Sequence, residues 1–160
     1  MPAVVEEKEG VVAPSSLHKL LYLPYPKAAD ELLRAALDLK EKVVKKTWVR
    51  YGRRAKDFTL YTGALGTAFL LFKAYQVTNN RNDLSLCSEI IRACDFASQG
   101  DPHVTFICGR AGVCALGAVV AKHAGDDMLL NHYLSSFSEV RISSSMRNEI
   151  SMWIIGFYQR

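Results

Sequence analysis

Apolar residues along the chain follow two patterns, and these patterns alternate. In residues 26–48, 84–98 and 127–140 they recur at the spacing of one helical face, with charged residues between them. In residues 66–77 and 113–124 nearly every position is apolar, which is typical of helices buried on all sides. The order therefore predicts an all-α chain in which three amphipathic outer helices alternate with two buried inner helices.

A repeated octet precedes each of the two apolar segments. In Thr59–Gly66 and Thr105–Gly112 the threonine and both glycines recur with an offset of 46 residues. A period of this size is typical of stacked helical hairpins, and roughly three or more such repeats are usually needed for stability. The chain contains two. Either a closed α/α toroid or an open solenoid would accommodate this order of helices.

The two glycines of each octet admit two interpretations. In the first, Gly63 and Gly109 adopt positive φ in a sharp turn, while Gly66 and Gly112 let the start of the inner helix pack closely against a neighbour. In the second, free N–H groups at the helix start bind an anion. Repetition favours the structural interpretation, because a packing requirement must recur in every repeat and a ligand site need not.

Composition limits the classes of function. The chain has 20 Lys and Arg against 16 Asp and Glu, a net charge of +4, which is too mild to indicate a nucleic-acid-binding protein. No apolar signal segment opens the chain, and the longest uncharged apolar run, residues 111–121, is shorter than the roughly 20 residues of a membrane-spanning helix. We therefore expect no transmembrane segment, reduced cysteines and a cytoplasmic location.

A basic stretch lies between residues 40 and 56, where Glu41 is the one acidic residue. One interpretation, which we favour, is the solvated outside of a helix and its exit loop. The other is a surface that meets an anionic membrane, peripherally at the plasma membrane, or a protein partner, with Trp48 and Tyr51 beside it. The basic residues are Lys40, Lys42, Lys45, Lys46, Arg50, Arg53, Arg54 and Lys56.

The octets resemble the repeat motif of lanthionine synthetase C-like (LanC-like) proteins. The resemblance is clear at Tyr61–Gly66 and stronger at Thr105–Gly112. The residues Tyr75–Asn80 resemble the plant branch of the family. It covers residues 27–140 and implies an α/α toroid of seven helical hairpins, of which this chain would hold about two. It also implies zinc enzymes that add a cysteine thiol, or glutathione in eukaryotes, to dehydrated Ser or Thr in peptides, with some plant members assigned to the plasma membrane.

The resemblance does not supply a metal site. The family's zinc is held by an isolated Cys and an adjacent Cys-His pair in later repeats, and this sequence contains no Cys-His pair. We considered Cys108 and Cys114 with His103 and His123 as a metal set, but the two cysteines lie six residues apart across a helix start. Cys87 and Cys94 share the apolar face of an outer helix, which indicates core residues. We therefore expect no catalytic residue, no metal ligand and no cofactor in this chain.

The ends of the chain fit the repeat pattern less well. Residues 1–25 are expected to form a loosely ordered arm, residues 26–140 the hairpin repeats, and residues 141–160 a divergent tail without a third glycine octet. The leading hypothesis is a non-catalytic N-terminal portion of a LanC-like protein. The alternatives are a peripheral membrane or signalling module that uses residues 40–56, and an α/α-toroid carbohydrate-related protein. The last would need paired carboxylates, which the inner segments lack.

Overall fold

The computed structural model describes residues 22–99, 101 and 105–139, and within them it contains helices, turns and loops but no strand. Most of the expected arm (residues 1–25) and all of the expected tail (residues 141–160) lie outside the described residues. The chain divides into two compact units, residues 1–36 and 37–160, and the first helix begins in one and ends in the other. The elements are α2 (Tyr25–Val44), the π-helix η1 (Lys45–Val49), α3 (Ala64–Thr78), α4 (Arg81–Ala97), α5 (Arg110–Ala124) and α6 (Asp127–Glu139).

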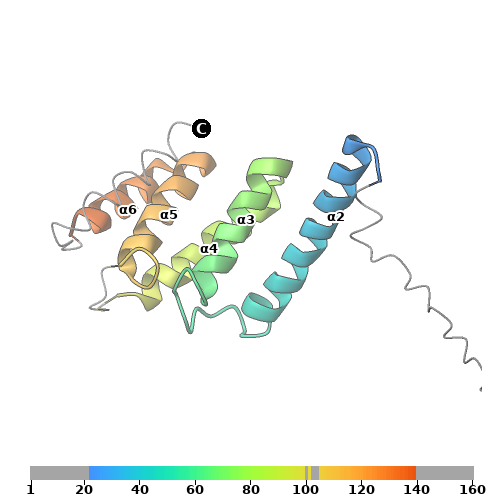
Figure 1. The fold of residues 1–160 in the computed structure, drawn as a ribbon. Helices are drawn as coiled ribbons and strands as arrows, with labels where there is room; N and C mark the ends of the chain where they lie inside the picture. Colours follow the sequence, from blue (N-terminus) through green and yellow to red (C-terminus); the bar gives the residue numbers. More distant parts are fainter. Residues whose placement is uncertain (1–21, 100, 102–104, 140–160) are drawn as a thin grey trace, which may run out of the picture. The chain divides into compact units, whose positions relative to one another are not determined.

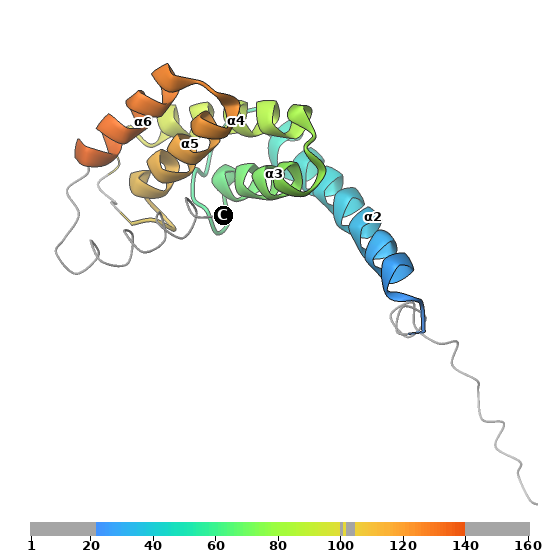
Figure 2. The ribbon, with the colours of Figure 1, turned by 90° about the horizontal axis from the view of Figure 1, so that it is seen from above.

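Helices α3 to α6 form two hairpins (Figures 1 and 2). Helix α3 packs against α4, helix α5 packs against α6, and α4 joins the hairpins by packing against α5. The apolar helices carry most of the core, as the sequence pattern predicts: in α5 an unbroken run from Ala111 to Ala118 is buried. Helix α3 departs from the prediction at its end, where Val77 is 68% exposed. The inner helices are therefore the core of the fold.

Short turns with polar caps connect the helices within each hairpin. Helix α3 is followed by its C-cap Asn79 in the left-handed conformation (φ 54°), and the side chain of Asn80 accepts a hydrogen bond from the Asn82 N–H at 3.1 Å. The cap of α4 is thus Asn80. The turn residues 79–83 in the sequence favour Asn82 or Asp83 as this cap, and that prediction is wrong. For α6 the sequence favours Asp126 or Asp127 as the cap, and the structure shows Asp126, whose carboxylate accepts from the Leu129 N–H at 2.9 Å.

The octets shape the start of each inner helix by excluding side chains. The prediction of positive φ at Gly63 and Gly109 is wrong, because both residues are extended N-caps with φ of −103° and −133°. The close packing predicted for Gly66 and Gly112 is present, but the nearest atoms belong to the octet's own loop. A Cβ at Gly66 would collide with the Leu60 carbonyl oxygen, and a Cβ at Gly112 would collide with that of Phe106. Each octet is therefore folded back onto its own helix.

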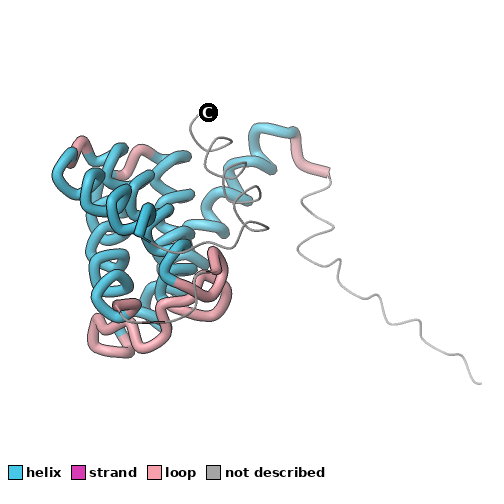
Figure 3. Tube along the Cα trace, turned by 90° about the vertical axis from the view of Figure 1, so that its left-hand side faces the viewer, coloured by secondary structure: helices cyan, strands magenta, loops and turns pink. Residues whose placement is uncertain are grey.

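The two octet loops also contact each other. The Leu60 N–H donates to the Ile107 carbonyl at 2.8 Å, so the backbone of the first loop pairs with that of the second. Figure 3 shows the longer connections gathered at one end of the hairpins. The prediction of an all-α fold with two hairpins of an α/α toroid is confirmed, and the octet loops lie together at the end where the inner helices begin.

Candidate functional site

Lys40 is not part of an exposed basic surface. It is 4% exposed, and its Nζ lies 2.8 Å and 3.0 Å from the two carboxylate oxygens of Asp83 and 2.8 Å from Glu41 Oε1. Burial alone would lower the pKa of Lys40, but the hydrogen bonds and negative charges of Asp83 and Glu41 raise it above its ordinary value. The prediction that Lys40 contributes to a partner surface is wrong, because its charge is used inside the fold.

Trp48 is likewise unavailable to a membrane. It is 1% exposed and belongs to the core, and its indole N–H has no hydrogen-bond partner among the described residues. It lies in η1, where the backbone bonds run to the fifth residue back, as in Arg50 N–H to the Lys45 carbonyl at 3.0 Å. Val44 and Trp48 are four residues apart on one helical face, and both belong to the core. The seven remaining basic residues are exposed: Lys42, Lys45, Lys46, Arg50, Arg53, Arg54 and Lys56.

The structure brings part of this basic stretch and the first octet together around a pocket of about 390 Å³. Three segments form its wall: η1, the loop that follows it, and the start of α3. The basic stretch and the glycine-rich start of α3 therefore lie beside each other in the structure. Their separation in the sequence did not indicate this. The residues that line this basic pocket are Lys46, Thr47, Tyr51, Arg54, Lys56, Asp57, Thr62, Gly63 and Ala64.

Asp57 organises the loop beside the basic pocket. Its carboxylate accepts from the Thr59 N–H and from the Thr62 hydroxyl, each at 2.8 Å, and its backbone carbonyl accepts from the Ala64 N–H at 2.7 Å. Burial alone would raise the pKa of Asp57, but the hydrogen bonds from Thr59 and Thr62 lower it below its ordinary value. Asp57 is therefore an anchor of the octet, and its charge is stabilised by the loop itself.

The second octet is surrounded by a different set of charges. The helical pattern of residues 84–98 predicts that Asp95 of α4 points outward, and this prediction is wrong because Asp95 is buried. One of its oxygens lies 3.3 Å from Arg110 Nη2 and the other lies 2.9 Å from His132 Nε2. His132, for which the sequence indicated no partner, therefore joins α6 to α4. This cluster joins the start of α5 to α4 and α6.

The described residues do not fit the zinc site that the LanC-like resemblance implies. Within them no three His, Cys, Asp or Glu side chains converge as a metal site would require. Cys108 is exposed on the octet loop, Cys114 is buried in α5, and His103 lies outside the described residues. His123 stands nine residues beyond Cys114 on the same helix, roughly 13 Å along its axis, and packs against Phe72 with ring centroids 5.1 Å apart.

The four cysteines should differ sharply in reactivity. Burial, with smaller effects of nearby groups, raises the pKa of Cys87 and of Cys94 to about 12 and that of Cys114 to about 11. At pH 8 about one in a thousand or fewer of these buried thiols would be a thiolate. We expect an aromatic disulfide reagent at pH 8 to modify Cys108 rapidly and the other three only in urea. Cys108→Ser should remove the fast phase, and a second fast thiol would contradict the assignment.

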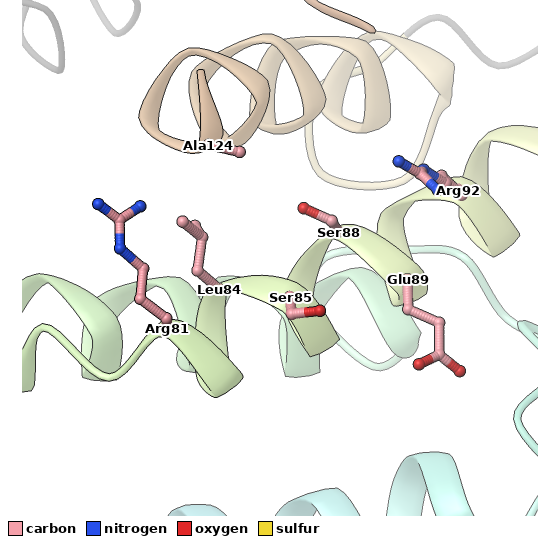
Figure 4. Close-up of a pocket in the computed structure, with 7 residues that line it drawn as sticks. All are labelled: Arg81, Leu84, Ser85, Ser88, Glu89, Arg92 and Ala124. Atoms are coloured by element: carbon pink, nitrogen blue, oxygen red, sulfur yellow. The ribbon is translucent and has the colours of Figure 1, made fainter. Parts of the chain in front are cut away.

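A second pocket, of about 460 Å³, lies between α4 and the end of α5 (Figure 4). Leu84 and Ser88 point toward α5, whereas Glu89 points away from it. The charged groups here have partners: Arg81 donates to the His123 carbonyl at 3.5 Å, and Arg92 lies 3.9 Å from Asp126. The contacts of the two arginines thus link α4 to the end of α5 and to the turn that follows it.

Sequence reasoning missed Asp57, Asp83 and Asp95 as structural residues. One signal was present for Asp57, because an Asp two residues before Thr59 matches a turn in which the carboxylate accepts from the backbone. No local signal identifies the other two. Asp83 pairs with a residue 43 positions away, and Asp95 pairs with one 37 positions away.

The fold and the octets together define a helical-hairpin protein with glycine-capped inner helices. Residues 54–156 match the family described as lanthionine synthetase C-like protein. The chain belongs to this family. It is 46% identical over 120 residues to LanC-like protein GCL1 of Arabidopsis thaliana, a match that covers 69% of this chain and 28% of the relative. The match to the family extends into residues 141–156, and the similarity to a plant relative agrees with the expected plant branch.

The described helices include none that is both long enough and apolar enough to cross a membrane.

Proposed function

We propose that this chain supplies two scaffold hairpins of a LanC-like protein that adds a thiol to dehydrated serine or threonine in a peptide. In that reaction the sulfur bonds to the β-carbon of the alkene, the carbon–carbon double bond becomes single, and the α-carbon takes up a proton. The chain's own residues would take no part in making these bonds.

One observation carries this proposal: both octets make the same internal contact. Gly66 and Gly112 each hold the third position of an inner helix, and each faces a backbone carbonyl of its own loop, that of Leu60 or of Phe106. Glycine is required there because any side chain would displace the loop. A requirement that recurs unchanged in both repeats supports a scaffold role for the motif.

The chain spans 28% of the length of its Arabidopsis relative. We propose that the zinc ligands and the glutathione-binding residues implied by the resemblance belong to the remaining length. The chemistry of the cysteines supports this, because burial raises the pKa of Cys87, Cys94 and Cys114 and so disfavours the thiolate form that zinc binds.

The test uses a peptide containing dehydroalanine, glutathione and mass spectrometry. The full-length Arabidopsis relative should produce the glutathione adduct faster than buffer, and this chain alone should not. A chimera in which residues 54–139 replace the matching segment of the relative should retain the activity. The proposal fails if the relative forms no adduct, if this chain binds stoichiometric zinc and forms the adduct alone, or if the folded chimera is inactive.

A further inference from the structure

The basic pocket has an excess of positive charge that the fold does not use. Lys46, Arg54 and Lys56 line it, and the one acidic residue in its wall is Asp57. The Asp57 carboxylate is already occupied by Thr59 and Thr62. Three cations against one carboxylate leave two positive charges in the wall.

None of these three cations has an ion-pair partner within the described residues. The neighbouring Arg53 differs, because its guanidinium lies 3.6 Å from Glu89. Lys56 lies 5.7 Å from the centre of the Tyr51 ring, a contact that keeps its charge while holding the ammonium at the rim. The pocket wall thus gathers cations whose charge remains available, although like charges repel one another. An anionic ligand would relieve this repulsion.

The remaining wall leaves the recognition of an anion to the three cations. The Thr47 hydroxyl donates to the Val43 carbonyl and the Thr62 hydroxyl donates to the Asp57 carboxylate. The Ala64 N–H at the start of α3 donates to the Asp57 carbonyl. The helix dipole adds positive potential at this end. A volume of about 390 Å³ lies within the range of small-molecule pockets.

We propose that the basic pocket binds a phosphate monoester carried by a small soluble molecule, with Lys46, Arg54 and Lys56 as the recognising cations. A soluble ligand is favoured over a lipid surface because the cations line a concave site and the neighbouring Trp48 is buried in the core. Tyr51 at the rim offers an aromatic face to the organic part of the ligand. This site is separate from the thiol addition proposed for the family.

The first test measures binding of phenyl phosphate to the full 160-residue chain by calorimetry, with benzoate as a monoanionic comparison. We expect saturable binding of phenyl phosphate that is at least about tenfold tighter than that of benzoate, because a dianion meets paired guanidinium and ammonium groups. Lack of saturable binding, or equal binding of the two anions, would overturn the proposal.

Matched variants separate the pocket from general surface charge. Arg54→Ala and Lys46→Ala remove cations of the pocket wall, whereas Lys42→Ala and Arg50→Ala remove exposed cations that do not line it. We expect the first pair to weaken binding about tenfold and the second pair to change it less than about twofold. Equal weakening by both pairs would assign the effect to net charge and reject the pocket.

A third experiment tests whether the phosphate monoester that binds the pocket belongs to a lipid headgroup instead of a soluble molecule. The chain is sedimented with phosphatidylcholine vesicles containing phosphatidylinositol 4-phosphate, with and without excess phenyl phosphate. We expect the chain to stay in the supernatant in both cases. Sedimentation that depends on Arg54, together with no binding of free phenyl phosphate, would replace the soluble ligand by a membrane surface.

Discussion

Lys40→Met should lower the free energy of unfolding by about 3–5 kcal/mol, because it leaves a buried carboxylate without its counter-charge. Asp83 is 6% exposed, and Lys40 is the residue that bonds both of its oxygens. The methionine can fill the volume of the lysine stem but cannot donate a hydrogen bond. The loss is measured by urea unfolding followed by circular dichroism.

Two further variants test whether the loss of stability comes from the unpaired carboxylate of Asp83. Lys40→Met combined with Asp83→Leu should recover most of the loss, since a well-packed apolar pair can replace a buried ion pair. Lys42→Met, an exposed neighbour on the same helix, should change stability by no more than about 0.5 kcal/mol. A single-variant loss below about 1 kcal/mol would show that the pair is not buried as described.

The Lys40–Asp83 ion pair also determines the direction in which the stability of the chain changes with pH. The pKa of Lys40 in the folded chain is raised above its ordinary value of 10.5. Its contribution to stability is therefore fully present below pH 10.5 and is lost as the pH rises through the higher pKa of the folded state. The difference in the free energy of unfolding between wild type and Lys40→Met should therefore narrow as the pH rises through that alkaline range.

Gly112→Ala should destabilise the chain by about 3 kcal/mol, although alanine is the better helix former. A Gly-to-Ala change inside a helix ordinarily stabilises by about 0.5–1 kcal/mol. Here the new Cβ would collide with the Phe106 carbonyl oxygen, a backbone atom that cannot rotate away, and would come within 3.5 Å of Leu65. Overpacking of this kind typically costs about 1–3 kcal/mol. The sign of the change in a thermal or urea unfolding curve is the decisive measurement.

Gly66→Ala is the matched change in the first octet and should act in the same direction, because its Cβ would meet the Leu60 carbonyl. The control is Gly125→Asn. Gly125 has φ +74° with open space around it, and asparagine tolerates that conformation. Equal stabilities for Gly112→Ala and wild type would mean that the octet is a flexible loop, in conflict with its role as a fixed start of the inner helix.

The helices could be predicted from the sequence because their periods are local. The unbroken apolar run of α5 and the turn chemistry at Gly125 and Asp126 specify the second hairpin within a few residues of chain. The sequence pattern predicts the start of α4 three residues late for a different reason. Asp is a common helix N-cap, but the carboxylate of Asp83 binds the buried Lys40 instead of capping α4.

The site was less predictable because its determinants are not local. The helical pattern predicts that a charged residue on an amphipathic helix points outward. This prediction is wrong for Lys40 and Asp95, because both are buried with partners that are distant in sequence. The glycine φ angles failed for another reason. Positive φ and steric exclusion of a Cβ both require glycine, so the sequence of the octet cannot distinguish them. The approach of the basic stretch to Gly63 follows from the π-helix and the loop after it, and no sequence rule indicates either.

The hydrogen bond between the Leu60 N–H and the Ile107 carbonyl joins two backbone atoms, so it places no demand on either side chain. Natural selection can therefore preserve the pairing of the octet loops while the residues at these positions change. An insertion or deletion between the two loops is a different matter, because it would shift one hairpin against the other. Divergence within the family should consequently alter the composition of the repeat more readily than its length.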